Sequence, residues 1–479
     1  MKNKVNNSVV ENGVTIKLHT VIRILAMMTL LVVHCASNEL RAENPRYNFV
    51  FILADDLGWT DLGCMGSPVY QTPNIDALAR GGMRFTQAYS ACTVCSPTRA
   101  SILTGQYPAR LHLTDWIKGH VRPYAKLKIP DWTMYLSTNV TTIAKVLKSA
   151  GYTCASIGKW HLGGEDYYPE KHGFDINIGG CDKGQPPSYF SPYKIPTLTD
   201  GPKGEYLTDR EAQEAVNFIR KNKDKPFFLY LAHHAVHTPL MAKSNLVEKY
   251  KVITQTNSVH KNPTYAAMIE SMDESVGAVM KCLRELNLEE KTIVIFTSDN
   301  GGLLNVTTNI GIRAGKGSSY EGGVRVPLIV YWKNVVKPGS TCDVPVISVD
   351  YFPTILEIAG LKAPENHVID GVSIVPLLKQ TGKLSRENIF WHYPHYHPGG
   401  ATPYSAVRSG NYKLIEFFED SRLELYDLAA DPAETTNIAS QKPELTGKLH
   451  ALLKEWREKV GAQLPTPNPN YDPAKDKKR

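Results

Sequence analysis

The stretch that decides the fold is FVFILADDLG, at residues 49–58. Six apolar residues run without a break into two acidic residues, and a glycine closes the segment. A continuous apolar run of this length indicates a strand buried on both faces, as in a parallel sheet covered by helices. Similar runs occur at 154–157, 227–232 and 292–296. We therefore expect these four segments to be buried parallel strands.

Helical patterns lie between the expected strands. Residues 72–82 begin with Thr72 at an N-cap position and Pro73 in the first turn, and they end at a glycine pair. Residues 264–286 carry apolar side chains three or four positions apart, which is typical of a long amphipathic helix. The alternation predicts an α/β fold, with a large central, mostly parallel mixed sheet sandwiched by helices.

The composition changes near residue 378, where an apolar segment gives way to polar residues up to 386. Four short strand patterns and one helix pattern follow, at 388–392, 404–408, 412–417, 424–427 and 442–460. They predict a smaller C-terminal α+β subdomain that carries an antiparallel sheet. The predicted organisation is a leader at 1–42, a catalytic domain at 43–380, the C-terminal subdomain at 381–465 and a polar tail at 466–479.

The N-terminus resembles an export signal. The apolar run at 24–33 follows basic residues and precedes small ones, and it is shorter than the ~20 residues that span a bilayer. We expect a signal peptide and a secreted or periplasmic protein. Lipid attachment at Cys35 is disfavoured, because His34 before it is larger than such processing usually accepts.

The charge excludes one class of partner. The net charge of +7 comes from 54 basic and 47 acidic residues, and the basic residues cluster only in the C-terminal tail. A nucleic-acid-binding protein needs a concentrated basic stripe instead. We therefore expect no nucleic-acid partner, and no membrane contact beyond the export signal.

Polar clusters follow each of the four expected strands. Because the carboxyl ends of parallel strands meet at one edge of a sheet, where open α/β sheets bind ligands, these clusters should line one crevice. The clusters are Asp55-Asp56, Lys159-Trp160-His161, His233-His234 with His237, and Asp299-Asn300.

The acidic and amide members suggest a metal site. Asp55, Asp56, Asp299 and Asn300 offer oxygen ligands only, which suit calcium or magnesium better than zinc. Any one of them alone is better explained as a helix or turn cap. Together they predict a site for a hard divalent cation.

The segment Cys95-Ser96-Pro97-Thr98-Arg99, with Thr104-Gly105 downstream, resembles the signature of the sulfatase family. In that family the motif Cys-x-Pro-x-Arg, then four residues and Thr-Gly, directs oxidation of the cysteine to formylglycine. Two further blocks match, at 158–163 and 315–327, and the resemblance spans 49–428. It implies an alkaline phosphatase-like fold and a sulfuric ester hydrolase of the arylsulfatase type.

The resemblance also implies a role for each site residue. Cys95, modified by a formylglycine-generating maturation enzyme, would supply the nucleophile and a ligand to one calcium ion per chain. Asp55, Asp56, Asp299 and Asn300 would hold that ion. Arg99 would hold the hydrated aldehyde. Lys159 and Lys316 would balance the sulfate charge, His237 would give a proton to the leaving alcohol, and His161 would take the proton that releases sulfate.

Other hypotheses compete at Cys95 and for the whole chain. Cys95 could be part of a redox pair with Cys92, part of a structural disulfide or a buried free thiol. A thioredoxin-like redox site, however, would lie in a much smaller βαβ unit and would not need Pro97 and Arg99. A phosphatase on the same scaffold would use serine or threonine with two zinc ions, whereas a formylglycine-dependent phosphodiesterase is harder to distinguish. A non-catalytic glycan-binding relative should have lost at least one of the six catalytic residues. All six are present here: Cys95, Arg99, Lys159, His161, His237 and Lys316.

The expected substrate is a sulfated carbohydrate or an aryl sulfate. The segment 391–397, rich in aromatic and histidine residues, would line a sugar-binding cleft or form a packed surface hairpin. A second candidate wall is Trp116, Lys118, His120 and Arg122. Fold-level analogy does not choose the sugar.

Overall fold

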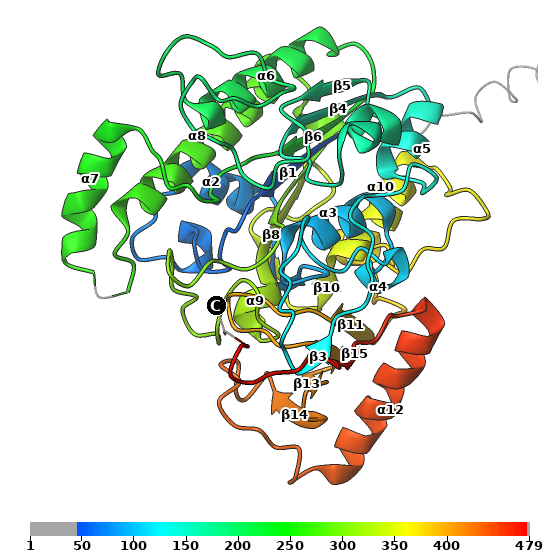
Figure 1. The fold of residues 1–479 in the computed structure, drawn as a ribbon. Helices are drawn as coiled ribbons and strands as arrows, with labels where there is room; N and C mark the ends of the chain where they lie inside the picture. Colours follow the sequence, from blue (N-terminus) through cyan, green and yellow to red (C-terminus); the bar gives the residue numbers. More distant parts are fainter. Residues whose placement is uncertain (1–45, 258, 477–479) are drawn as a thin grey trace, which may run out of the picture. The chain divides into compact units, whose positions relative to one another are not determined.

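A nine-stranded sheet runs through the centre of the computed structural model, which describes residues 46–257 and 259–476 (Figure 1). The order of its main path is β10-β2-β8-β7-β1-β6-β4-β5, and β9 pairs with β2. The strands are β1 (Asn48–Ala54), β2 (Met83–Tyr89), β4 (Thr153–Gly158), β5 (Ile176–Ile178), β6 (Phe227–Ala232), β7 (Thr292–Ser298), β8 (Arg325–Trp332), β9 (Ser340–Cys342) and β10 (Val346–Ile347).

The sheet is mostly parallel, as predicted. Strand β1 pairs in parallel with β6 and β7, and β4 pairs in parallel with β6 and β5. Strand β8 alone runs against its neighbours, β7 and β2. All four strands expected from the sequence are present and adjacent: β6 and β7 flank β1, and β4 pairs with the other edge of β6.

Helices cover both faces, and alternate side chains of β1 contact different helices because successive strand residues point to opposite faces. Phe49, Phe51 and Leu53 pack in one hydrophobic cluster, whereas Val50, Ile52 and Ala54 pack in another. The first cluster contains α3 (Cys95–Thr104), α5 (Ile143–Ser149), α10 (Tyr351–Ala359) and α11 (Val375–Leu378). The second contains α2 (Pro73–Gly81), α6 (Leu207–Lys221), α7 (Ser244–Gln255) and α8 (Pro263–Glu285).

The start of α2 differs in detail from the prediction. Thr72 occupies the N-cap position and Pro73 the first turn, but the Thr72 hydroxyl makes no capping bond to the helix backbone. It donates instead to Asp76 over 2.9 Å and accepts from the backbone of Gly63. The cap therefore ties α2 to the preceding loop.

A separate four-stranded antiparallel sheet follows, in the order β11-β12-β13-β14. Its strands are β11 (Asn388–Tyr393), β12 (Tyr404–Ser409), β13 (Tyr412–Phe417) and β14 (Arg422–Asp427), and α12 (Pro443–Val460) packs against β12 and β13. The ring of Trp456 on α12 stacks on Phe390 with centroids 4.7 Å apart. The antiparallel sheet and the helix predicted for the C-terminal part are thus confirmed.

Short elements complete the fold. The two-residue strand β15 (Thr466–Pro467) pairs with β3 (Leu127–Lys128), so part of the predicted polar tail adds to the folded structure. The remaining short helices are α4 (Pro108–Leu111) and α9 (Glu321–Val324), with 3₁₀ turns at Gly63–Met65, Glu165–Tyr167, Pro169–His172, Glu289–Lys291 and Ser348–Asp350.

The predicted signal peptide and Cys35 lie outside the described residues, and the domain boundaries stay predictions. Within residues 46–257 and 259–476, no helix is both long enough and apolar enough to cross a membrane.

Candidate active site

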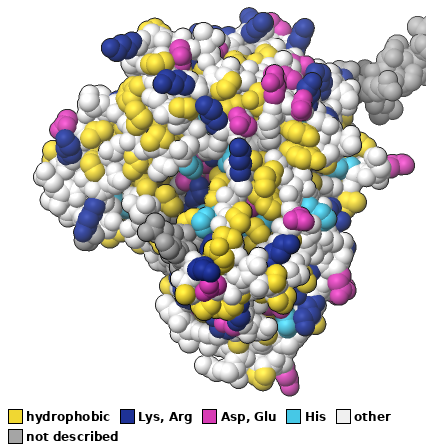
Figure 2. All heavy atoms as spheres, in the orientation of Figure 1, with side chains coloured by type: hydrophobic (Ala, Val, Ile, Leu, Met, Phe, Trp, Pro, Cys, Tyr) yellow, Lys and Arg dark blue, Asp and Glu magenta, His cyan; other side chains and the backbone are white. Residues whose placement is uncertain are grey.

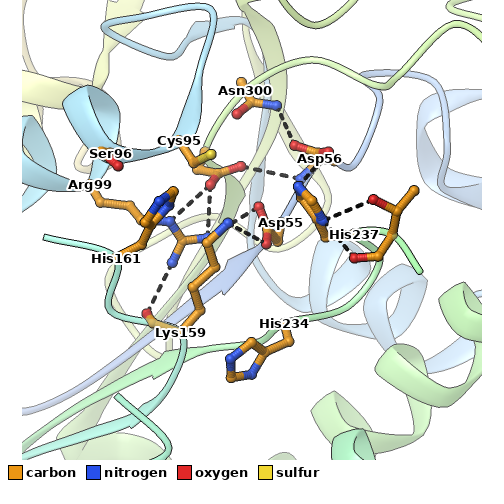
Figure 3. A network of polar contacts seen from close by, with 12 residues as sticks. Asp55, Asp56, Cys95, Ser96, Arg99, Lys159, His161, His234, His237 and Asn300 are labelled. Carbon is orange, nitrogen blue, oxygen red and sulfur yellow. Dashed lines mark hydrogen bonds and ion pairs between the residues drawn. The ribbon is translucent and has the colours of Figure 1, made fainter. Parts of the chain in front are cut away.

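The carboxyl ends of the four neighbouring strands β4, β6, β1 and β7 place the predicted polar clusters in one crevice (Figure 3). Asp55 and Asp56 directly follow β1, and Asp299 directly follows the last residue of β7. The backbone N–H of Asp56 donates to Asp299 Oδ1 over 3.2 Å, which joins the ends of these two strands. Asp56 and His161 both adopt left-handed backbone conformations, with φ of 62° and 57°. Such conformations cost energy in residues other than glycine and are often found at functional sites.

Four buried charged side chains, two basic and two acidic, form the floor of the crevice. Arg99, on α3, is fully buried, and its Nη2 lies 2.7 Å from Asp299 Oδ2 and 3.4 Å from Asp55 Oδ1. Its Nη1 donates to the carbonyl of Lys159, whose own Nζ donates to Asp55 Oδ2 over 2.7 Å. Burial would lower the pKa of Arg99, but Asp299 and Asp55 outweigh it and raise this pKa. The guanidinium is therefore a fixed positive charge.

A second group of charges lies beside the first. Lys316 Nζ donates to both carboxylate oxygens of Asp56, at 2.7 and 2.8 Å, and lies 3.3 Å from His237 Nε2. Burial opposes the ionisation of Asp56, but Lys316 and His237 outweigh it, so the pKa of Asp56 lies well below its usual range. The pKa of Lys316 is raised, because Asp56 more than offsets the effect of burial.

Cys95 is the first residue of α3, so its side chain lies at the positive end of a helix. Its Sγ is 4.0 Å from Lys316 Nζ. Thr98 fixes the turn that precedes Cys95. Its hydroxyl accepts from the Cys92 backbone N–H and also contacts the carbonyls of Cys92 and Val94. Burial raises the pKa of the Cys95 thiol, and the nearby lysines offset this only in part.

The described cysteines are all free, including Cys92 and Cys95. This arrangement does not support the redox-pair and disulfide hypotheses for Cys95. The thiol lies instead in the crevice among the charged residues.

The residues fit a divalent cation. Asp55, Cys95 and Asp299 each offer a ligand atom, and these atoms lie within 4.8 Å of one another; Asp55, Asp56 and His237 form a second such group. In the described part of the chain, Asn300 Oδ1 is buried without a hydrogen-bond partner, and Asp55 Oδ1 has only its 3.4 Å ion pair with Arg99. Buried polar oxygens normally have partners, so these two atoms favour an additional ligand. Asn300 Nδ2 donates to Asp56 Oδ1, which orients the amide oxygen.

The two predicted catalytic histidines have defined tautomers. His237 Nδ1 bonds to the carbonyl of Thr238 at 2.8 Å, so it carries the proton, and Nε2 faces Lys316 and Asp56. His161 Nε2 donates to the carbonyl of Ile117, which leaves the buried Nδ1 with a free lone pair and no partner among the described residues. Burial lowers the pKa of both rings, that of His237 to about 3.

His233 and His234 have a different role. Their Nδ1 atoms each lie 2.6 Å from one oxygen of the buried Glu211 carboxylate, and His233 Nε2 also bonds to Ser275. Glu211 lies on α6 and gave no signal in the sequence. This bridge holds the segment after β6 that leads to His237.

The crevice opens to the surface through a pocket of about 330 Å³. In Figure 2 this region is a hollow near the centre of the face, where histidine, basic and acidic side chains gather. The pocket is lined by the predicted residues Asp56, Cys95, His161, His237 and Lys316, and by Trp116, Ile117, Gly184, Gln185, Thr238, Leu303 and His397. Trp116 and His397 belong to the two candidate walls; the other five lie in loops without a recognisable pattern.

Both alternatives for the segment 391–397 hold in part. Trp391, His392 and His395 are buried, and the Trp391 indole donates to the Ser90 carbonyl as in a packed hairpin. Only His397 from this segment lines the pocket. From the second candidate wall, Trp116 lines it, while Arg122 pairs with Asp476 elsewhere.

Comparisons with known proteins agree with this geometry. The family model described as "Sulfatase" matches residues 47–361, and one described as "N-sulphoglucosamine sulphohydrolase, C-terminal" matches residues 315–459. The chain belongs to the sulfatase family. Members of this family are sulfuric ester hydrolases, and the neighbouring solved structures share the alkaline phosphatase-like fold.

Individual relatives cover most of the chain. It is 33% identical to a sulfatase of Formosa agariphila, over 89% of this chain and 92% of the relative, and 34% identical to human arylsulfatase A, over 85% and 82%. Among solved structures, Ps i-CgsB superposes with a TM-score of 0.74 at 30% identity, covering 89% of this chain and 94% of that one. Ps i-CgsB has also been solved in complex with k-i-k-neocarrahexaose.

Proposed function

We propose that this protein hydrolyses the sulfate monoesters of a sulfated carbohydrate, with Cys95 converted to formylglycine and one calcium ion beside it. The observation that carries the proposal is the position of Cys95. Its side chain lines the pocket, at the start of α3 and next to Lys316, and its Sγ lies within 4.8 Å of a carboxylate oxygen of Asp55 and of Asp299.

Charge balance supports an anionic substrate. Three cations, Arg99, Lys159 and Lys316, alternate with three carboxylates of the site. The three positive charges offset the three negative ones, so a divalent cation would leave a net positive site for the sulfate group. Fixed charges in such a water-poor site are typically the largest contribution to catalysis.

Calcium fits the oxygen-rich ligand set of Asp55, Asp56, Asp299 and Asn300, and when bound it would draw charge from a sulfate oxygen and acidify the nucleophile. Arg99 would orient the modified side chain at position 95, since its guanidinium is fixed by Asp299 and Asp55. Lys159 and Lys316 would hold the sulfate oxygens.

The histidine tautomers suit the roles implied by the family. His237 Nε2 faces the pocket and, once the ring has taken up a second proton at this atom, would give it to the leaving alcohol. His161 Nδ1 has its lone pair free and is the atom that would take a proton when sulfate leaves. An anionic ester bound beside His237 would raise its pKa towards the range that this role requires.

The carbohydrate substrate is supported by the carrageenan oligosaccharide bound to Ps i-CgsB and by the size of the pocket, which suits one sugar ring. Export through the predicted signal peptide would place the enzyme where such polymers occur. A formylglycine-generating enzyme is a required partner, since the thiol itself is a poor nucleophile in this buried position.

The test is mass spectrometry of the peptide that contains Cys95, together with 4-nitrophenyl sulfate hydrolysis in the presence of calcium. We expect the formylglycine mass and turnover, both absent from a Cys95→Ala variant. Purification from a host with the maturation enzyme that yields only thiol and no turnover would contradict the proposal. Faster hydrolysis of bis-(4-nitrophenyl) phosphate than of the sulfate ester would favour the phosphodiesterase alternative.

A further inference from the structure

His397 lines the pocket, and the proposed mechanism does not use its chemistry. It lies in the loop between β11 and β12, in a tight turn. The His397 carbonyl accepts from Gly400, its backbone N–H donates to the Ala401 carbonyl, and its ring Nδ1 accepts the Gly399 N–H over 2.8 Å. An acceptor nitrogen carries no proton, so the neutral ring bears its proton on Nε2.

The ring is held against the loop that carries Lys316. A Cβ atom added at Gly317 would lie 1.7 Å from His397 Nδ1, so only glycine allows the ring to pack there. The Trp116 ring meets the imidazole edge to face, with centroids 4.9 Å apart. Within the described part of the chain, no residue accepts a hydrogen bond from His397 Nε2. This N–H therefore remains available at the wall of the pocket.

The imidazole is uncharged in this position. Burial, together with the nearby Lys316 ammonium, lowers the pKa of His397 to about 3. A neutral N–H donor is suited to a hydroxyl or ring oxygen, whereas recognition of a second sulfate would call for arginine or lysine. The three cations of the site are already close to carboxylates.

We propose that Trp116 and His397 form the subsite for the sugar ring that bears the sulfate. The indole provides apolar surface for the C–H face of a pyranose, and His397 Nε2–H donates to a free hydroxyl on a carbon next to the sulfate ester. This inference rests on the proposed function and adds a substrate class: pyranose sulfates whose neighbouring position is unsulfated. Sugars with sulfate at both positions would bind less well.

The test compares two kinds of substrate for the mature enzyme. Galactose 2-, 3- and 4-sulfate, each of which has a hydroxyl on a carbon next to the ester, are screened, and the best is compared with its analogue lacking the neighbouring hydroxyl and with 4-nitrophenyl sulfate. We expect His397→Leu to lower kcat/KM about 30-fold for the hydroxyl-bearing sugar, mainly through KM. The loss for the deoxy sugar and the aryl sulfate should be at least ten times smaller.

Further variants at His397 and Trp116, with one control, separate recognition from folding. His397→Gln, which keeps an N–H near the position of Nε2, should recover part of the loss, and Trp116→Phe should retain more sugar activity than Trp116→Ala. His112→Leu is the matched control, since this histidine contacts Gly461 outside the pocket and should change neither activity.

Two results would overturn the subsite while leaving the sulfatase activity intact. One is an equal loss of kcat/KM on sugar and aryl substrates in His397→Leu. The other is an enzyme that hydrolyses 4-nitrophenyl sulfate but turns over no pyranose sulfate. Absence of all sulfate hydrolysis by protein shown to carry formylglycine would overturn the proposed function and the subsite with it.

Discussion

Lys413 should be among the most sensitive positions outside the pocket. Its side chain is fully buried on β13, 3.1 Å from Glu321 Oε1 and 3.0 Å from Glu434 Oε1, and both carboxylates are fully buried too. In addition, Glu434 Oε2 accepts the backbone N–H of Glu321, the first residue of α9. One ammonium group thus stabilises two carboxylates where the second sheet meets the catalytic part.

Replacing Lys413 with methionine removes the charge and keeps most of the apolar stem. Because it leaves buried carboxylates without their partner, we expect the free energy of unfolding to fall by about 3–5 kcal/mol. For a folded unit of about 430 residues, an unfolding entropy of about 2.1 cal/mol/K per residue converts this to a fall in Tm of about 3–6 °C.

The pH dependence provides a second signature. Burial raises the pKa of Glu434 to about 7, and Glu321 adds to this, whereas Lys413 opposes it. A carboxyl group with a raised folded-state pKa stabilises the protein most below its unfolded pKa, and this contribution is lost as the pH rises through the folded-state value. Without Lys413 the pKa of Glu434 rises further, so the variant should lose more stability at pH 8 than at pH 5.

Thermal unfolding followed by circular dichroism at pH 5 and pH 8 tests both expectations. Lys383→Met is the matched control on an exposed lysine and should change stability by less than about 0.5 kcal/mol. Adding Glu434→Gln to Lys413→Met should restore part of the loss, because it removes one unpaired charge. A Lys413→Met protein as stable as the control variant, or equally destabilised at both pH values, would refute the reasoning.

Three further predictions concern the site and its support. Lys316→Ala should lower kcat/KM for 4-nitrophenyl sulfate by about 10²–10³-fold, because it removes a fixed charge beside the reacting group. In the same steady-state measurement, the control variant Lys261→Ala, at an exposed lysine, should match wild type. Calcium should raise Tm by an amount that grows with the logarithm of one plus its concentration over Kd, and EGTA should reverse the shift. Asn300→Leu, which removes a buried unpaired oxygen, should abolish the shift, and a calcium shift of wild-type size in that variant would contradict the metal site. Burial opposes the ionisation of Glu211, but hydrogen bonds from His233 and His234 outweigh it and lower the pKa of Glu211 to about 2. The Glu211 carboxylate therefore stabilises the folded protein above pH 4.5, the ordinary pKa of glutamate, and this stabilisation is lost as the pH falls towards 2. Glu211→Gln should therefore be less stable than wild type in urea unfolding at pH 7, and the difference should shrink towards pH 3.

The sequence by itself determined the strand pattern and the chemistry. The run before Asp55, and the three similar runs, matched β1, β4, β6 and β7 to within two residues, because a strand buried on both faces needs continuous apolar residues. The Cys95 signature and the polar clusters at the strand ends indicated one crevice, because parallel strands bring their carboxyl ends to one edge.

Only the tertiary structure decided which side chains share a contact. Lys413 reads as a surface lysine on a strand, yet packing places it between two acids that are 92 and 21 residues away along the chain. Glu211 beneath His233 and His234, and His397 beside Trp116, are likewise brought together by the arrangement of helices and loops. The hydrophobic periodicity of a strand or helix can be recognised from neighbouring residues in the sequence. These pairings depend instead on how distant segments pack. That is why the sequence predicted the reaction centre, and the structure was needed to find the residues that support it and the wall that would receive the sugar.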